Sequence, residues 1–321
     1  MTKTKLTRTE IEPLVRQAFG GGTTTRDMSE LTGGMFNAAY RLRLSDGRET
    51  ILKVSPPADA RILTYETDIM RTEVEALRLV YGLDGVPVPE VYHYDPSRSL
   101  IGSEFFFMEF VPGTPYNELK SLASDAERAE IEREIGRINR RINAVTGSGF
   151  GLPGRGKPGA DSSWSSVFVQ LMDDLLEDGQ RLGVVLPMAY AEAEQAAAQL
   201  QPALEAVNQP QLVHWDLWEG NVMIREGRIV SILDWERALW GDPLMEYFFR
   251  RFVDNRQFLE GYGSHAEDTG SAARKALYDL YLGLIMVIEC RSREYTDAGH
   301  ITWVQSNLAA GWEHLRTILH S

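Results

Sequence analysis

Apolar residues recur at helical spacing through most of the chain beyond residue 111. Apolar positions three and four residues apart give a segment one apolar face, which predicts amphipathic helices packed around a core. The predicted helices span residues 124–145, 164–182, 187–207, 242–262, 268–292 and 300–320. Two further helices are expected earlier, at residues 7–19 and 69–80.

The region before residue 111 contains an alternating pattern instead. Tyr40, Leu42 and Leu44 alternate with polar residues, and an Asp46-Gly47 turn signal separates them from residues 49–54. This arrangement predicts a β-hairpin. If Asp46 and Gly47 form a two-residue loop, Lys53 lies opposite Tyr40.

Two more strands are expected in this region. The sequence Val86-Pro-Val-Pro89 favours an extended edge strand at residues 90–94. The apolar run 105–111 ends at Pro112-Gly113, as a buried strand would. A chain of 321 residues exceeds the usual size of one core. We therefore expect an α+β protein with a small β-rich lobe at residues 1–110 and a larger, mainly helical lobe at residues 111–321.

The charge balance limits the class of partner. The chain has 46 acidic and 33 basic residues, a net charge of −13. This argues against a nucleic-acid partner or an anionic membrane surface, which both attract basic proteins. A cationic small molecule would suit it, although surplus acid also maintains solubility. Four acids are candidates for holding such a cation, and local ion pairing would explain them equally well: Asp242, Glu246, Glu289 and Glu294.

The sequence favours a cytoplasmic protein. The basic N-terminus has no apolar stretch behind it, unlike a secretory signal. The apolar runs 105–111 and 281–288 are far shorter than the roughly 20 residues that span a bilayer. The single cysteine, Cys290, excludes an internal disulfide and fits a reducing compartment.

The strongest chemical signal is the sequence His214-Trp-Asp216-Leu-Trp-Glu-Gly-Asn221. Asp216 and Asn221 have the spacing of the catalytic aspartate and the metal-binding asparagine in the kinase pattern H-R-D-x-x-x-x-N. Residues 221–234 predict a hairpin around Gly227, which brings Asn221 opposite residues 232–234 and close to Asp234.

These residue types fit phosphoryl transfer. The amide oxygen of Asn221 and the carboxylate of Asp234 are hard ligands suited to Mg²⁺. Asp216 is then available to accept a hydrogen bond from a substrate hydroxyl and orient it. The alternative is that all three are polar residues forming turns.

A possible nucleotide site lies upstream. Gly33 and Gly34 precede the first hairpin, which returns Lys53 toward them. Glycines let backbone N–H groups approach phosphates, and a lysine adds a positive charge, although glycines before a strand commonly form only a turn. Glu73 lies on the otherwise apolar stripe of helix 69–80 and needs a partner if buried. Lys53 is the expected partner.

Two further segments have nucleotide-binding features. The backbone from Glu109 to Val111, with Met108 as an apolar wall, would suit an adenine base, although a buried strand without a ligand is the commoner explanation. Residues 151–157 have the Walker spacing G-x-x-x-x-G-K, but Pro158 stands where Ser or Thr must bind Mg²⁺. We interpret this second segment as a loop.

The motifs resemble those of the aminoglycoside phosphotransferase family, whose His-Gly-Asp-x-x-x-x-Asn and Ile-Asp-Trp signatures are similar to residues 214–221 and 232–235. The resemblance covers almost the whole chain. It implies a two-lobed, eukaryotic-protein-kinase-like fold, with nucleotide bound by residues 1–110 and with the catalytic loop, metal hairpin and substrate site in residues 111–321. It also implies Mg²⁺ and ATP as cofactors, with GTP not excluded.

Individual residues match this family's motifs. Gly34 and Asn37 resemble its nucleotide loop, Lys53 and Glu73 its ion pair, and residues 108–113 its hinge. Trp215 departs from the usual glycine of the signature. The large ring either restricts the backbone beside Asp216, forms a wall of the substrate site or packs structurally.

The expected function is transfer of the γ-phosphate of a nucleoside triphosphate to a hydroxyl of a small molecule. An aminoglycoside or another antibiotic is one class of acceptor, and a choline-like alcohol, a sugar or an amino-acid derivative is another. Trp215 keeps a second class of function open, a non-catalytic nucleotide-binding or partner-binding module on the same fold. The sequence leaves the acceptor and the oligomeric state undetermined.

Overall fold

The computed structural model describes residues 3–32, 34, 36–153, 163–263 and 267–320. Its chain forms two compact units. The first unit comprises Met1–Ala60, Met70–Ala123 and Glu219–Glu236, and the second comprises Arg61–Ile69, Ser124–Trp218 and Arg237–Ser321. Residues 219–236 thus pack with the N-terminal segments although they lie about 100 positions further along the chain.

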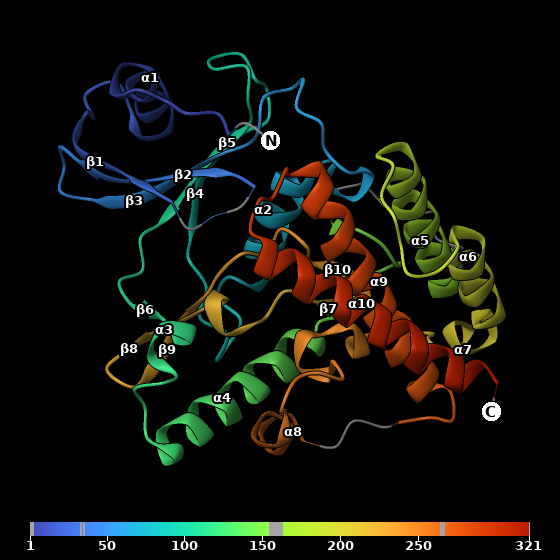
Figure 1. The fold of residues 1–321 in the computed structure, drawn as a ribbon. Coiled ribbons are helices and arrows are strands. Elements are labelled where there is room, and N and C mark those ends of the chain that lie inside the picture. The colour runs from blue at the N-terminus through green and yellow to red at the C-terminus, as the bar shows by residue number, and fades with distance from the viewer. Residues whose placement is uncertain (1–2, 33, 35, 154–162, 264–266, 321) are drawn as a thin grey trace. The chain divides into compact units, whose positions relative to one another are not determined.

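The first unit is built on a five-stranded antiparallel sheet with strand order β1-β2-β3-β5-β4 (Figure 1). The strands are β1 (Thr25–Leu31), β2 (Ala38–Leu44), β3 (Glu49–Val54), β4 (Val91–Asp95) and β5 (Phe105–Glu109). As predicted, β4 is an edge strand and β5 is buried. The sequence did not predict β1, because this edge strand has mostly exposed residues and no buried alternation.

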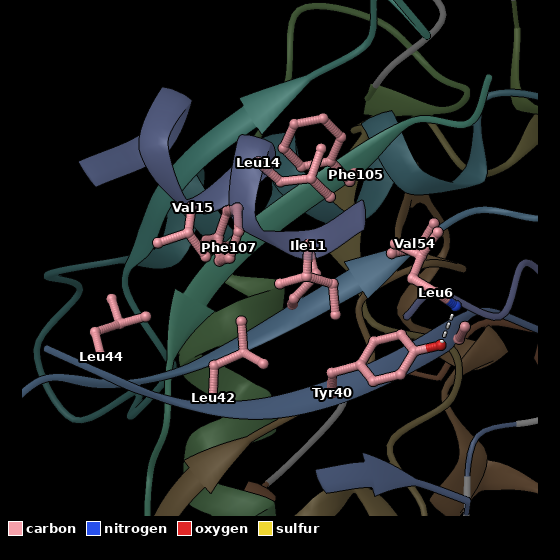
Figure 2. Close-up of a cluster of buried hydrophobic side chains, with 12 residues drawn as sticks. Leu6, Ile11, Leu14, Val15, Tyr40, Leu42, Leu44, Val54, Phe105 and Phe107 are labelled. Atoms are coloured by element: carbon pink, nitrogen blue, oxygen red, sulfur yellow. Dashed lines mark hydrogen bonds between the residues drawn. The ribbon is translucent and has the colours of Figure 1, made fainter. Parts of the chain in front are cut away.

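Helix α1 (Arg8–Phe19) covers one face of this sheet (Figure 2). Ile11, Leu14 and Val15 pack against alternate residues of the strands, including Tyr40 and Phe107. The backbone N–H of Leu6 donates a hydrogen bond of 2.8 Å to the Tyr40 hydroxyl, which joins the N-terminal segment to the same cluster.

The predicted register of the β2–β3 hairpin was wrong by one residue. Lys53 pairs with Ala39, and Tyr40 pairs with Leu52. The loop is longer than two residues, since Leu44 N–H donates to Arg48 O and Gly47 adopts a left-handed φ of 91°. The shift matters because Leu52 and Val54 face the α1 cluster. Lys53 therefore points to the opposite face of the sheet.

On that opposite face, Lys53 Nζ donates a hydrogen bond to Glu73 of α2 (Ile69–Val80). The same unit contains a three-stranded sheet of order β6-β8-β9 and the short helix α3 (Tyr116–Leu119). Its strands are β6 (Thr114–Pro115), β8 (Val222–Arg225) and β9 (Arg228–Ile232).

The second unit is mainly helical, as expected. Its helices are α4 (Asp125–Asn143), α5 (Trp164–Arg181), α6 (Tyr190–Gln199), α7 (Gln201–Glu205), α8 (Arg256–Tyr262), α9 (Ser271–Ser292) and α10 (Ala298–Leu319). Helix α4 packs on α8, and α9 packs on α10. A two-stranded sheet pairs β7 (Gln211–Val213) with β10 (Leu239–Gly241).

Two predicted helices differ from the structure. The segment 187–207 is divided between α6 and α7, because Pro202 has no N–H to continue a helical ladder. The segment 242–262 is helical only in α8. Two short 3₁₀ turns, Pro243–Met245 and Tyr247–Phe249, precede it, and Glu246 between them is extended. Among the described residues, no helix is long and apolar enough to cross a membrane.

Candidate functional site

Lys53 is the centre of a partly buried ion cluster in the first unit. Its Nζ lies 2.6 Å from Glu73 Oε1 and 3.0 Å from Asp234 Oδ1. The expected pairing of Lys53 with Glu73 is therefore present, and the two residues come from β3 and α2. Burial by itself would lower the pKa of Lys53, but the negative charges of Asp234, Glu73 and Glu236 outweigh it and raise that pKa. Lys53 is therefore positively charged.

Glu73 occupies the most buried position of this cluster. Burial raises the pKa of its carboxyl, and the positive charge of Lys53 opposes that rise. A buried carboxylate is tolerated only with a close partner. Lys53 supplies this partner.

The β8–β9 hairpin brings Asn221 and Asp234 to one end of the small sheet, as the sequence predicted. Val222 pairs with Ile232, and Leu233 N–H donates a 2.9 Å hydrogen bond to Asn221 O. The turn residues Glu226 and Gly227 have φ values of 52° and 72°, as in the tight turns that favour hairpins. Asp234 itself has a φ of 64°, in the left-handed region that Asp tolerates better than most residues.

Glu236 is a site residue that the sequence did not reveal. Oxygen atoms of Glu73, Asp234 and Glu236 lie within 4.8 Å of one another. Asn37 Nδ2 donates a 3.3 Å hydrogen bond to Glu236 Oε2, and the buried Asn37 Oδ1 accepts none among the described residues. The only sequence signal was its position two residues after Asp234.

This donor set fits a hard divalent cation. Carboxylate and amide oxygens are the ligands that Mg²⁺ prefers, and the cluster offers three carboxylates, one from α2 and two from residues 234–236. Asn221 is buried, and its backbone is fixed by the same hairpin that presents Asp234.

The structure describes most of the other residues that the sequence suggested for binding a nucleotide. Lys3 Nζ donates to Gly34 O, whereas Gly33 lies outside the described residues. Met108 is buried in β5, and its carbonyl accepts from Thr50 Oγ1 at 2.7 Å. Glu109 N–H donates to Glu90 O at 2.8 Å. That N–H is therefore committed to local structure, and Val111 follows beyond the end of β5.

The loop that carries Asp216 belongs to the second unit and is held by a buried carboxylate. Glu246 accepts backbone hydrogen bonds of 2.9 Å from both His214 and Trp215. Asn139 and Asn143 also donate to it, at 2.8 and 2.9 Å. Burial raises the pKa of Glu246, and these hydrogen bonds act in the opposite direction. The residue organises the loop and faces no solvent.

Trp215 is buried and adopts a left-handed φ of 64°. A glycine at this position avoids the steric penalty of that conformation, which gives the family's usual glycine a physical reason. The Trp215 ring stacks on Tyr281 of α9, with centroids 5.5 Å apart and planes inclined by 5°. Asp216 follows directly, and its N–H donates to His214 Nδ1 at 3.3 Å.

Partners inside the protein are described for three of the acids considered for binding a cationic ligand: Asp242, Glu246 and Glu289. Asp242 pairs with Arg274 at 2.7 Å. Glu289 pairs with Arg237 at 2.7 Å and Arg293 at 3.0 Å. Glu246 serves the loop as described, so these three acids are structural. Glu294 is exposed.

The loop with Walker-like spacing is only partly described, because residues 154–162 lie outside the described part of the chain. Gly151 forms an isolated bridge with Trp240.

Comparison with known proteins identifies the family. Residues 27–274 match the phosphotransferase enzyme family. Human acyl-CoA dehydrogenase family member 11 is 23% identical over 273 residues, which cover 80% of this chain. The chain spans only 20% and 32% of the length of the mouse member 10 and human member 11 proteins. Hygromycin-B 4-O-kinase of Escherichia coli is 26% identical over 294 residues, covering 88% of this chain and 80% of that protein.

A solved structure shows the same fold. A thermostable mutant of aminoglycoside phosphotransferase APH(4)-Ia, in complex with AMP-PNP and hygromycin B, superposes with a TM-score of 0.66 at 21% identity, covering 95% of this chain and 98% of that one. The predicted α+β, kinase-like fold class is thereby confirmed. The resemblance seen in the sequence motifs is confirmed as well, and the chain belongs to the phosphotransferase enzyme family.

Proposed function

We propose that this protein is a Mg²⁺-dependent kinase that transfers the γ-phosphate of ATP to a hydroxyl of a small molecule. The observation that carries the proposal is the ion cluster of Lys53, Glu73 and Asp234, drawn from three distant segments of the chain. Glu236 adds a third carboxylate whose oxygen lies within 4.8 Å of those of Glu73 and Asp234, and clusters of charged groups of this kind are typical of functional sites.

Each group has a proposed role on the nucleotide side. Lys53 contacts phosphate oxygens, and Glu73 keeps its ammonium group in place. Asn221 and Asp234, with Glu236 beside them, are the residues that would hold Mg²⁺. The ion would neutralise charge on the phosphates when bound. Gly33, Gly34 and Asn37 are the residues that would bind the phosphates, and Met108, Glu109 and Val111 are those that would bind the base.

Asp216 is the proposed catalytic residue on the acceptor side. A carboxylate there accepts a hydrogen bond from the acceptor hydroxyl and orients its oxygen for attack. Glu246 supports this role because it fixes the backbone of the two preceding residues. The backbone that carries Asp216 is therefore constrained, which helps to hold a catalytic group in position.

For the acceptor, we propose a hydroxylated molecule whose binding does not depend on a cluster of buried acids. The relatives include a hygromycin-B 4-O-kinase, so an aminoglycoside is one candidate class. The internal partners of Asp242, Glu246 and Glu289 remove three acids that would otherwise favour a polycationic ligand. Sugars, choline-like alcohols and amino-acid derivatives are therefore tested on equal terms.

A screen of ADP formation tests this proposal. The protein is incubated with Mg²⁺ and ATP, or with GTP, in the presence of hygromycin B, other aminoglycosides, sugars, choline-like alcohols and hydroxy amino acids. At least one acceptor is expected to stimulate ADP formation, and EDTA is expected to abolish it. If Mg·ATP stabilises the protein thermally but no acceptor in any class stimulates turnover, the non-catalytic module is the better explanation.

A further inference from the structure

The residue before Asp216 has a backbone conformation that its own side chain disfavours. Trp215 has a φ of 64°, and the β-carbon of an L-residue is crowded in this left-handed region. Asn and Asp offset such crowding with local hydrogen bonds, and glycine avoids it. An indole side chain does neither. The surrounding structure must therefore hold Trp215 in place.

Two contacts hold this residue, one at its backbone and one at its ring. The backbone N–H donates to Glu246 Oε2 at 2.9 Å. The ring stacks almost parallel on Tyr281, with centroids 5.5 Å apart. Within the described residues the buried indole Nε1 has no hydrogen-bond partner, so packing rather than polar contact fixes the ring.

Tyr281 is itself fixed by its neighbours. It lies on the long helix α9, and its ring meets Phe168 of α5 edge to face, at a centroid distance of 5.3 Å. The Trp215 ring is therefore part of a set of packed aromatic rings that includes residues of α9 and α5 in the second unit. A stack of this kind restrains both the position and the tilt of a side chain.

We propose that the Trp215–Tyr281 stack is a clamp that keeps the catalytic loop in its left-handed conformation, and that Trp215 is thereby a positioning residue for Asp216. The catalytic consequence rests on the proposed function, whereas the clamp itself does not. Rotation of the backbone at Trp215 out of the left-handed region would redirect the chain at Asp216. Glycine would adopt this conformation without strain, whereas Trp215 is held in it by the stack of its ring on Tyr281.

The clamp makes a distinct kinetic prediction. A small displacement of a catalytic group lowers turnover without weakening nucleotide binding, because the nucleotide-side residues lie elsewhere in the sequence. Trp215→Gly and Tyr281→Leu are each expected to lower kcat for ADP formation about 10- to 100-fold. The KM for Mg·ATP is expected to stay within about twofold. Trp215→Phe should recover most of the loss, since a phenyl ring can still stack.

A double-mutant cycle with two readouts tests the clamp. The readouts are kcat for ADP formation from Mg·ATP, with hygromycin B and with water alone as acceptor, and amide hydrogen exchange over residues 212–220. The double variant is expected to match Trp215→Gly in both readouts, because the two rings act as one unit. Phe258→Leu is the matched control, since it disrupts the Phe248–Phe258 stack of 4.6 Å in the same unit. It should lower thermal stability and leave kcat unchanged.

Two outcomes would overturn the clamp. One is wild-type exchange over residues 212–220 in Trp215→Gly, and the other is a double variant whose exchange rate shows the two effects simply multiplied. Exchange needs no phosphoryl transfer, so this readout is independent of the proposed function. Full turnover in Asp216→Ala would instead reject the proposed function and leave the clamp standing if the exchange results hold.

Discussion

At the scale of single residues, the ion pair of Lys53 with the buried Glu73 can be tested by the free energy of unfolding. Lys53→Met leaves Glu73 buried without its partner, which is expected to cost about 3–5 kcal/mol of unfolding free energy. Adding Glu73→Leu removes the stranded charge and should restore most of that loss, because an apolar pair of similar volume is often neutral. Urea denaturation of the two variants measures both effects.

An exposed ion pair provides the control for this experiment. Arg48 and Asp46 pair at the surface of the first hairpin, where side chains are screened by water. Arg48→Ala is expected to change stability by no more than about 1 kcal/mol. If Lys53→Met were as stable as Arg48→Ala, Lys53 would not be needed to stabilise the buried Glu73 carboxylate.

Glu246 predicts a particular dependence on pH. Because burial raises its pKa in the folded state above the usual 4.5, the folded protein holds this proton more tightly than the unfolded chain. The contribution of Glu246 to stability is therefore largest at low pH and falls as pH rises from about 4.5 through the folded-state pKa.

Glu246→Gln isolates that contribution. One carboxylate oxygen becomes an amide N–H₂ facing donors, so the variant is expected to lose about 1–3 kcal/mol. The stability difference between wild type and Glu246→Gln should shrink as pH rises through this window, in urea titrations between pH 4 and 8. A difference that grows with pH would reverse the sign of the pKa shift and reject the assignment.

At the scale of elements, α4 and α8 approach so closely that only glycine fits at their crossing. A β-carbon at Gly261 would lie 1.9 Å from Arg133 O, and one at Gly136 would lie 2.2 Å from Phe258 O. Gly136→Ala and Gly261→Ala are each expected to lower the unfolding free energy by about 1–3 kcal/mol or more. Gly311→Ala in α10 meets nothing within 4 Å and should raise it by about 0.5–1 kcal/mol. Thermal unfolding of the three variants would contradict this packing if all three shifted alike.

The elements also show what a sequence can and cannot predict. The hairpin that joins Asn221 to Asp234 was predictable because strand pairing around a tight turn is local. The register of the first hairpin was not, since loops of two and three residues share the Asp-Gly signal. The segment around Glu246 was predicted as helix because its apolar spacing is helical. The buried hydrogen bonds of Glu246 are instead set by residues about 30 and 100 positions away.

At the scale of the whole molecule, the sequence predicted the two compositions, β-rich and helical, and the family. It did not predict that residues 219–236 would pack with the N-terminal segments, because that grouping depends on contacts between distant positions. The role of Glu236 was missed for the same reason, since only folding brings it to Glu73. A local sequence pattern does not show which charged residues from distant segments come together in the fold.

The likeness to longer proteins bears on function at this scale too. The chain matches only 20% and 32% of the length of two acyl-CoA dehydrogenase relatives, but 80% of hygromycin-B 4-O-kinase. The proposed reaction therefore concerns this chain and does not extend to the rest of those longer proteins.

The most direct test of the proposed kinase activity is phosphoryl transfer by the Asp216→Asn variant. Transfer from γ-labelled ATP to the best acceptor of the screen is measured together with the Kd for Mg·ATP. We expect kcat to fall by about 10²- to 10⁴-fold while the Kd for nucleotide is nearly unchanged, because Asp216 acts on the acceptor hydroxyl. Wild-type turnover in Asp216→Asn would contradict this expectation.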